Sequence, residues 1–177
     1  MSLQIFLGAR YHGEVRTKTK WLTNEQQVAW RAYLLAFRLL EGDLDRQLQR
    51  DSGLAHTHYG VLVALSEAPG QTLRMSDLAT LQRFSQSRLT HAVARLERDG
   101  YVVREQCPSD RRGQLAHLTP AGMAALQAAA PGHVAEVRAK VFDRLSEEQV
   151  AALRDVCETL LEGLDRPPGC PTSDLAV

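Results

Sequence analysis

Residues 85–122 read SQSRLTHAVARLERDGYVVREQCPSDRRGQLAHLTPAG, and this stretch decides the fold. Ser85 is placed to cap a helix, which Gly100 ends in the C′ position. The β-branched and aromatic residues of 101–106 predict a strand, and the alternation of polar and apolar residues in 114–118 predicts a second strand that pairs back with it. Thr119-Pro120 is an N-cap and N1 pair. The stretch therefore predicts a helix, a β-hairpin and the start of a further helix.

The residues just before this stretch predict two shorter helices. The segment HTHYGVLVALSEAPG (56–70) is typical of a helix stopped by Pro-Gly, TLRM (72–75) of a short extended segment, and SDLATLQ (76–82) of a helix capped by Ser76. Two capped helices joined by a few residues and followed by a β-hairpin make a winged helix-turn-helix. We expect residues 56–120 to form this domain.

Longer helices flank the domain. Apolar residues recur at steps of three and four in 24–50 and also lie on other faces, so that this helix must be covered from more than one side. Another helix is expected from about Pro120 to Arg144, kinked or broken at Pro131. The last follows the capping box SEEQ (146–149). Residues 1–22 are expected to be an N-terminal arm, and the Pro-rich residues 166–177 a disordered tail.

Composition excludes several classes of protein. The 177 residues are 44% hydrophobic and 24% charged with a net charge of zero, which is typical of a globular domain and not of a disordered chain. The charges are unevenly distributed: residues 83–112 hold seven Lys/Arg against four Asp/Glu, which favours a surface for an anion. The chain has no apolar run of membrane-spanning length and no fingerprint of a hydrolase, P-loop or Rossmann enzyme. We expect no enzyme and no cofactor.

The three cysteines have no CxxC spacing, which argues against a disulfide framework or a zinc site and fits a reducing cytoplasm. No other metal-ligand spacing appears. Cys157 occupies an apolar helical position and is expected to pack in the core. Cys107 lies at the base of the hairpin beside a proline, where we expect partial exposure.

The second helix of the pair has two distinct faces. Leu89, Val93 and Leu96 fall at i, i+4 and i+7 and would anchor it in the core. The other face offers hydroxyl groups and arginine, which suit base edges and phosphates in a major groove. The candidate DNA-binding residues on this helix are Ser85, Gln86, Ser87, Arg88, Thr90, His91 and Arg95. The alternative is a solvated helix face with ordinary pairs such as Arg95 and Asp99.

Three segments carry a resemblance to the MarR family of winged-helix transcription regulators: MSDLA (75–79), SQSRLTHAVARLERDGYVVRE (85–105) and SDRRGQLAHLTPAG (109–122). The resemblance covers about residues 24–164. It implies a mostly α fold with a small β-hairpin wing (α+β), in which residues 23–55 and 121–165 form a helical dimerisation domain. It also implies a cytoplasmic homodimer that binds a pseudo-palindromic operator in double-stranded DNA, more often as a repressor than as an activator.

The resemblance also assigns roles within the wing. Arg112 matches the arginine that enters the minor groove, where a narrow groove has enhanced negative potential. Arg111 occupies a more variable position and is expected to contact phosphate only. Asp110 matches the aspartate that braces the wing, through an arginine such as Arg104 or Arg112.

Regulation is expected at one of two places. Family members often release DNA when a small molecule enters a pocket between the dimerisation helices and the winged domain. Candidate pocket residues are Trp30, Tyr33, Phe37, His56, His58 and Tyr59, although aromatics at helical spacing are more often core. Cys107 offers a second route, as a redox sensor. A further alternative is a winged-helix module that binds protein, for which the arginines would be dispensable.

Overall fold

The computed structural model describes residues 19–107 and 110–164, without the side chains of residues 111 and 112. The expected tail and residues 1–18 of the expected arm lie outside this part of the chain. The chain divides into two compact units, residues 1–36 and 37–177. The helices and strands are α1 (Asn24–Ser52), α2 (His56–Glu67), η2 (Pro69–Gln71), β1 (Thr72–Arg74), α3 (Met75–Leu81), α4 (Gln86–Arg98), β2 (Val102–Cys107), β3 (Asp110–Leu118), α5 (Pro120–Lys140), η3 (Phe142–Arg144) and α6 (Glu147–Glu162).

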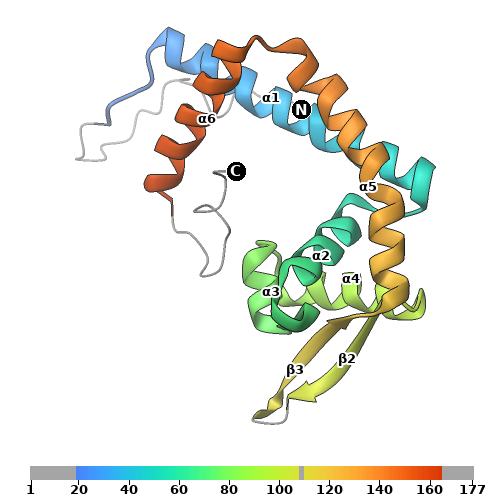
Figure 1. Cartoon of the computed structure of the whole chain (residues 1–177). Coiled ribbons are helices and arrows are strands. Elements are labelled where there is room, and N and C mark those ends of the chain that lie inside the picture. Colours follow the sequence, from blue (N-terminus) through green and yellow to red (C-terminus); the bar gives the residue numbers. More distant parts are fainter. Residues whose placement is uncertain (1–18, 108–109, 165–177) are drawn as a thin grey trace, which may run out of the picture. The chain divides into compact units, whose positions relative to one another are not determined.

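Helices α2, α3 and α4 pack with a small sheet around one core. Its largest fully buried side chains are Leu48, Leu62, Leu65, Leu78, Leu89, Leu96, Val61, Val93 and Val102. Full burial of each leucine contributes about 1.5–3 kcal/mol relative to an exposed side chain. The predicted winged helix-turn-helix is confirmed: the fold is mostly helical, with one small antiparallel sheet (Figure 1).

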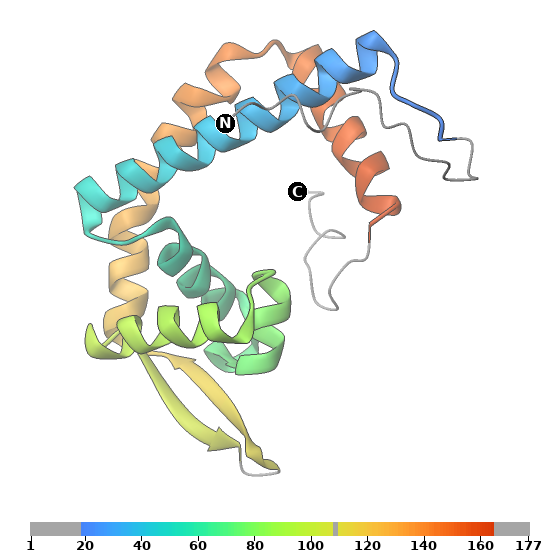
Figure 2. The same ribbon diagram turned by 180° about the vertical axis from the view of Figure 1, so that it is seen from behind.

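The sheet has three strands in the order β1-β3-β2. The hairpin pairs Val102 with Leu118 and Arg104 with Ala116, and β1 pairs Thr72 with His117 on the other side of β3. The first three residues of the predicted extended segment at 72–75 are therefore the third strand, and Met75 already belongs to α3. The β2–β3 hairpin extends away from the three helices (Figures 1 and 2).

The helix starts on either side of the hairpin follow the sequence signals. The Ser85 hydroxyl accepts the Arg88 N–H at 3.2 Å, and Gly100 has φ +76° after the end of α4. Thr119 accepts the Gly122 N–H at 3.0 Å, and its own hydroxyl donates to the Gly100 carbonyl at 2.8 Å. Thr119 thus caps α5 and also ties it to the turn after α4.

Two expectations about helices need correction. Of the kink or break expected at Pro131, the break is wrong, because helix α5 continues through this exposed residue to Lys140. Ser76 does not cap α3: the helix begins at Met75, directly after β1, and the Ser76 hydroxyl donates to the Asp77 carboxylate at 3.1 Å.

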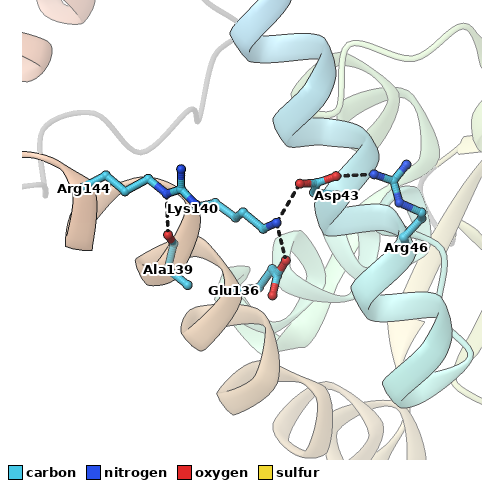
Figure 3. A network of polar contacts seen from close by, with 6 residues as sticks. All are labelled: Asp43, Arg46, Glu136, Ala139, Lys140 and Arg144. Carbon is cyan, nitrogen blue, oxygen red and sulfur yellow. Dashed lines mark hydrogen bonds and ion pairs between the residues drawn. The ribbon is translucent and has the colours of Figure 1, made fainter.

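Helix α5 contacts the C-terminal half of α1 through charged side chains. The Lys140 ammonium is 2.9 Å from the Asp43 carboxylate and 3.5 Å from that of Glu136, and Asp43 also pairs with Arg46 (Figure 3). The hydrogen bond from Lys140 lowers the pKa of Asp43, and the same bond raises the pKa of Lys140. This network fixes the two helices to each other beside the winged domain.

Candidate nucleic-acid interface

Helix α4 separates its core residues from its candidate binding residues. Leu89, Ala92, Val93 and Leu96 are buried. The candidate set Ser85, Gln86, Ser87, Arg88, Thr90, His91 and Arg95 is exposed throughout. Because side chains three, four and seven residues apart share one side of a helix, the exposed residues form a continuous polar strip opposite the core. The strip can enter a groove while the core stays intact.

Arg88 is held at the N-terminal end of this strip. Its guanidinium lies 4.3 Å from the centre of the Phe84 ring and donates a hydrogen bond to the Thr57 hydroxyl at 3.3 Å. Stacking of this kind restricts the arginine without neutralising it. Arg88 therefore offers a positioned charge between the starts of α2 and α4.

Arg95 forms the ion pair that the alternative interpretation named. Its Nε is 3.0 Å from the Asp99 carboxylate, with 54% of the arginine side chain exposed. An exposed pair of this kind contributes little and is easily exchanged for a phosphate contact. The half-buried His58 is nearby, and burial, followed by the charge of Arg95, lowers its pKa.

Arg98 is a residue that the sequence interpretation missed. It is exposed in the last turn of α4. With Ser87 and His91 it falls at i, i+4 and i+11, which places all three on the side of the helix opposite Leu89 and Leu96. That spacing is visible in the sequence and could have identified it.

The wing places its two arginines on β3. Arg111 and Arg112 follow Asp110 at the start of that strand, but their side chains lie outside the described residues. Asp110 pairs with Arg74 of β1 at 3.3 Å. Of the two arginines expected to brace Asp110, Arg104 is instead bound to Glu97 of α4 at 2.5 Å, and the side chain of Arg112 lies outside the described residues.

Cys107 is buried at the base of the wing. Only 5% of it is exposed, so the expectation of partial exposure was wrong. The strand pairing shifts between Gln106 and Cys107, and the thiol side chain packs close to Gly113. Cys157, expected in the core, is exposed on α6.

The candidate pocket residues fall into two groups. Trp30 and Tyr33 of α1 stack on each other with ring centres 5.8 Å apart, and both are about half exposed, as is Phe37. His56 and Tyr59 of α2 both lie against His133 of α5, at 5.6 Å and 4.6 Å between ring centres. The structure adds His133 to the second group, whereas the half-buried His58 belongs to neither group and lies near Arg95.

His133 is the most constrained member of that group. Its Nδ1 is buried and has no hydrogen-bond partner among the described residues. Burial, followed by the charge of His56, lowers its pKa. His56 faces Glu41 of α1 at 3.3 Å. The cluster joins α1, α2 and α5.

Large apolar side chains remain exposed on several helices of the single chain. On α1 they include Val28, Trp30, Tyr33, Leu35, Phe37 and Leu39, and on α6 Leu153, Val156 and Leu160. Such surfaces mark interfaces with other molecules.

In the described part of the chain, no helix is long and apolar enough to cross a membrane, and no cluster of three or more His, Cys, Asp or Glu side chains could hold a metal.

Comparisons with known proteins agree with this arrangement. The family model described as MarR family matches residues 52–113. Sco3205, a MarR family transcriptional regulator from Streptomyces coelicolor solved in complex with DNA, is 52% identical, with 85% of this chain and 95% of that chain covered and a TM-score of 0.78.

Two further relatives show the same kinship. AbsC, another MarR family transcriptional regulator from Streptomyces coelicolor, is 43% identical over 82% of this chain and 97% of that chain, with a TM-score of 0.75. The transcriptional repressor YetL of Bacillus subtilis (strain 168) is 30% identical over 61% of this chain and 66% of its own length. The chain spans between 45% and 82% of the length of the curated relatives that it matches.

Proposed function

Since the chain belongs to the MarR family of transcription regulators, we propose that it binds a duplex DNA operator through α4 and the β2–β3 wing. Its relatives are named as regulators of transcription, which assigns the chain to regulation and not to an enzyme class. The observation that carries the proposal is the exposed polar strip of α4, with Ser87, His91 and Arg98, backed by buried leucines. Sco3205, solved with DNA, supports it.

The two elements have different tasks in this proposal. Helix α4 enters the major groove, where its hydroxyl, imidazole and guanidinium groups contact base edges and phosphates. The wing follows the backbone, with Arg112 in the minor groove and Arg111 at a phosphate. Arg88 and Arg98 contact phosphates at the two ends of α4, so that affinity falls with rising salt.

The proposal includes a homodimer that acts in the cytoplasm. The exposed apolar side chains of α1 and those of α6 need a cover, and helices of a second copy would bury them. Residues 23–55 and 121–165 are then the dimerisation domain. Two-fold symmetry gives a pseudo-palindromic operator with half-sites roughly 10 bp apart.

We propose repression as the regulatory outcome, with release by a small molecule. YetL, which is named as a repressor, supports the first point. The cluster of His56, Tyr59 and His133 supports the second, because it lies where α1, α2 and α5 meet and Nδ1 of His133 has no hydrogen-bond partner in the described part of the chain. A ligand that forms a hydrogen bond with this nitrogen would alter the packing of α5 against α2.

The test is a titration of a duplex that the protein itself enriches from a random pool. Arg112→Ala should weaken binding of that duplex about tenfold at moderate salt. The matched control is Arg138→Ala, which removes an exposed arginine of α5 that pairs with Asp143 and should change affinity less than about twofold. Equal affinities for the parent and the Arg112 variant would contradict a wing that reads DNA.

Sedimentation at micromolar concentration tests the dimer separately. A dimer is expected, and a stable monomer would contradict the proposed architecture. If the chain is instead a protein-binding module, the duplex pool should yield no enriched sequence.

A further inference from the structure

A single carboxylate joins the last turn of α4 to the first residues of the wing. Oε1 of Glu97 accepts the Arg104 peptide N–H at 3.1 Å, and Oε2 accepts its Nε–H at 2.8 Å and lies 2.5 Å from Nη2. The two side chains are only 27% and 25% exposed. Partly buried, charge-assisted bonds of this geometry are much stronger than an exposed ion pair.

The contact restrains the hairpin where it leaves the helix. Strand β2 is an edge of the sheet, where backbone N–H groups that point outward have no neighbouring strand to bond. Glu97 accepts one such group, the Arg104 N–H. The intervening turn is held by the Tyr101 N–H, which donates to the Leu96 carbonyl at 2.9 Å. Two adjacent attachments, one through the backbone and one through Glu97, therefore restrain the direction in which β2 leaves α4, in addition to its pairing with β3.

That direction decides where the far end of β2 lies. From Arg104 to Cys107 the strand extends roughly 10 Å, at about 3.3 Å per residue. A tilt of about 10° at its base would move Cys107 by roughly 2 Å over that length, enough to break a hydrogen bond. The Arg74–Asp110 ion pair, at 3.3 Å, links β1 to the start of β3 with side chains 40% and 46% exposed.

We propose that Glu97 and Arg104 are positioning residues that hold the wing at the angle at which α4 and Arg112 contact one duplex together. This inference rests on the proposed function. Neither residue has to touch DNA. Their effect passes through the orientation of the hairpin.

A double-mutant cycle tests the inference on the duplex enriched from the random pool. Arg112→Ala is measured in the parent and in Glu97→Gln, which keeps the shape of the side chain and an acceptor for the Arg104 N–H but loses the charge that binds the guanidinium. We expect Arg112→Ala to weaken binding about tenfold in the parent and less than about threefold in Glu97→Gln. Arg112→Ala costs less affinity in Glu97→Gln because a wing that is no longer held contributes little to DNA binding.

Asp99→Asn is the matched control. It removes one negative charge from the same end of α4, where Asp99 pairs with Arg95 of its own helix. Asp99→Asn and Glu97→Gln each remove one negative charge, so a general electrostatic gain in DNA affinity is matched between these two variants. In Asp99→Asn, Arg112→Ala should again cost about tenfold.

Two outcomes contradict different statements. If Arg112→Ala costs the same factor in Glu97→Gln as in the parent, the positioning role is wrong while the proposed function stands. If Arg112→Ala changes nothing in the parent, the wing does not read DNA, and both proposals fail. Arg104→Lys, which keeps the peptide N–H contact and the charge but loses the planar fork, replaces Glu97→Gln if that variant unfolds; the same two outcomes decide.

Discussion

Gly122, in the first turn of α5, offers the sharpest prediction about the stability of the fold. A Cβ at this position would lie 2.2 Å from the Tyr101 carbonyl oxygen and 2.8 Å from Cδ1 of Leu118. Nonbonded heavy atoms are optimally separated by roughly 3.5–4.0 Å. Gly122→Ala therefore cannot be accommodated without moving either the start of α5 or the turn after α4.

Neither backbone segment can move freely. The Thr119 N–H donates to the Tyr101 carbonyl at 3.0 Å, and the Thr119 hydroxyl donates to the Gly100 carbonyl at 2.8 Å. Overpacking of this kind costs about 3 kcal/mol at the upper end of its usual range. Loss of one hydrogen bond adds about 1 kcal/mol, and the better helix propensity of alanine returns about 1 kcal/mol. We expect Gly122→Ala to lower the free energy of unfolding by about 3 kcal/mol.

Gly42→Ala provides the matched control. Gly42 is also a helical glycine, but its Cβ would meet only the flexible Arg46 guanidinium, at 3.5 Å. This variant should be neutral or more stable by up to about 1 kcal/mol. Both are measured by denaturant unfolding followed by far-ultraviolet circular dichroism, at equal protein concentration. A Gly122 variant that unfolds at the same denaturant concentration as the parent would refute the argument.

The remaining predictions concern pH, DNA contacts and oxidation. Burial lowers the pKa of His133 below its usual 6.5, so the unfolded state binds the proton more readily. Stability should therefore be complete above about pH 6.5 and fall at lower pH, and His133→Phe should reduce the difference in unfolding midpoint between about pH 7.5 and 5.5. Arg98→Ala should weaken duplex binding about fivefold and reduce the slope of log affinity against log salt concentration by about one. Fluorescence anisotropy at several salt concentrations measures both, and an unchanged slope would exclude a phosphate contact. Because Cys107 is buried, peroxide should leave DNA binding largely intact; a reversible loss that Cys107→Ser abolishes would establish it as a redox sensor.

The sequence predicts the winged helix-turn-helix well because its signals are local. The Ser85 cap, the turn at Gly100 and the Thr119 cap each depend on a few neighbouring residues, and the structure confirms all three. At Pro131 the alternative of a break was wrong, since α5 continues through this residue to Lys140.

Side-chain partners in the candidate site could not be predicted in the same way. Asp110 finds Arg74, 36 residues away in the sequence, only because β1 and β3 are neighbours in the sheet. Arg104 pairs with Glu97 across the turn between α4 and β2, which the sequence order alone does not specify. Cys157 shows a different limit: apolar periodicity identifies a face to be covered, but not whether the same chain covers it.

The central claim is that α4 and the wing of two copies read one duplex, and selection of bound DNA from a random duplex pool tests it most directly. We predict enrichment of a pseudo-palindrome whose half-sites are roughly 10 bp apart, and loss of that enrichment in a variant that carries both Arg98→Ala and Arg112→Ala. A pool that shows no enriched sequence, or the same enrichment with the double variant, would contradict the claim.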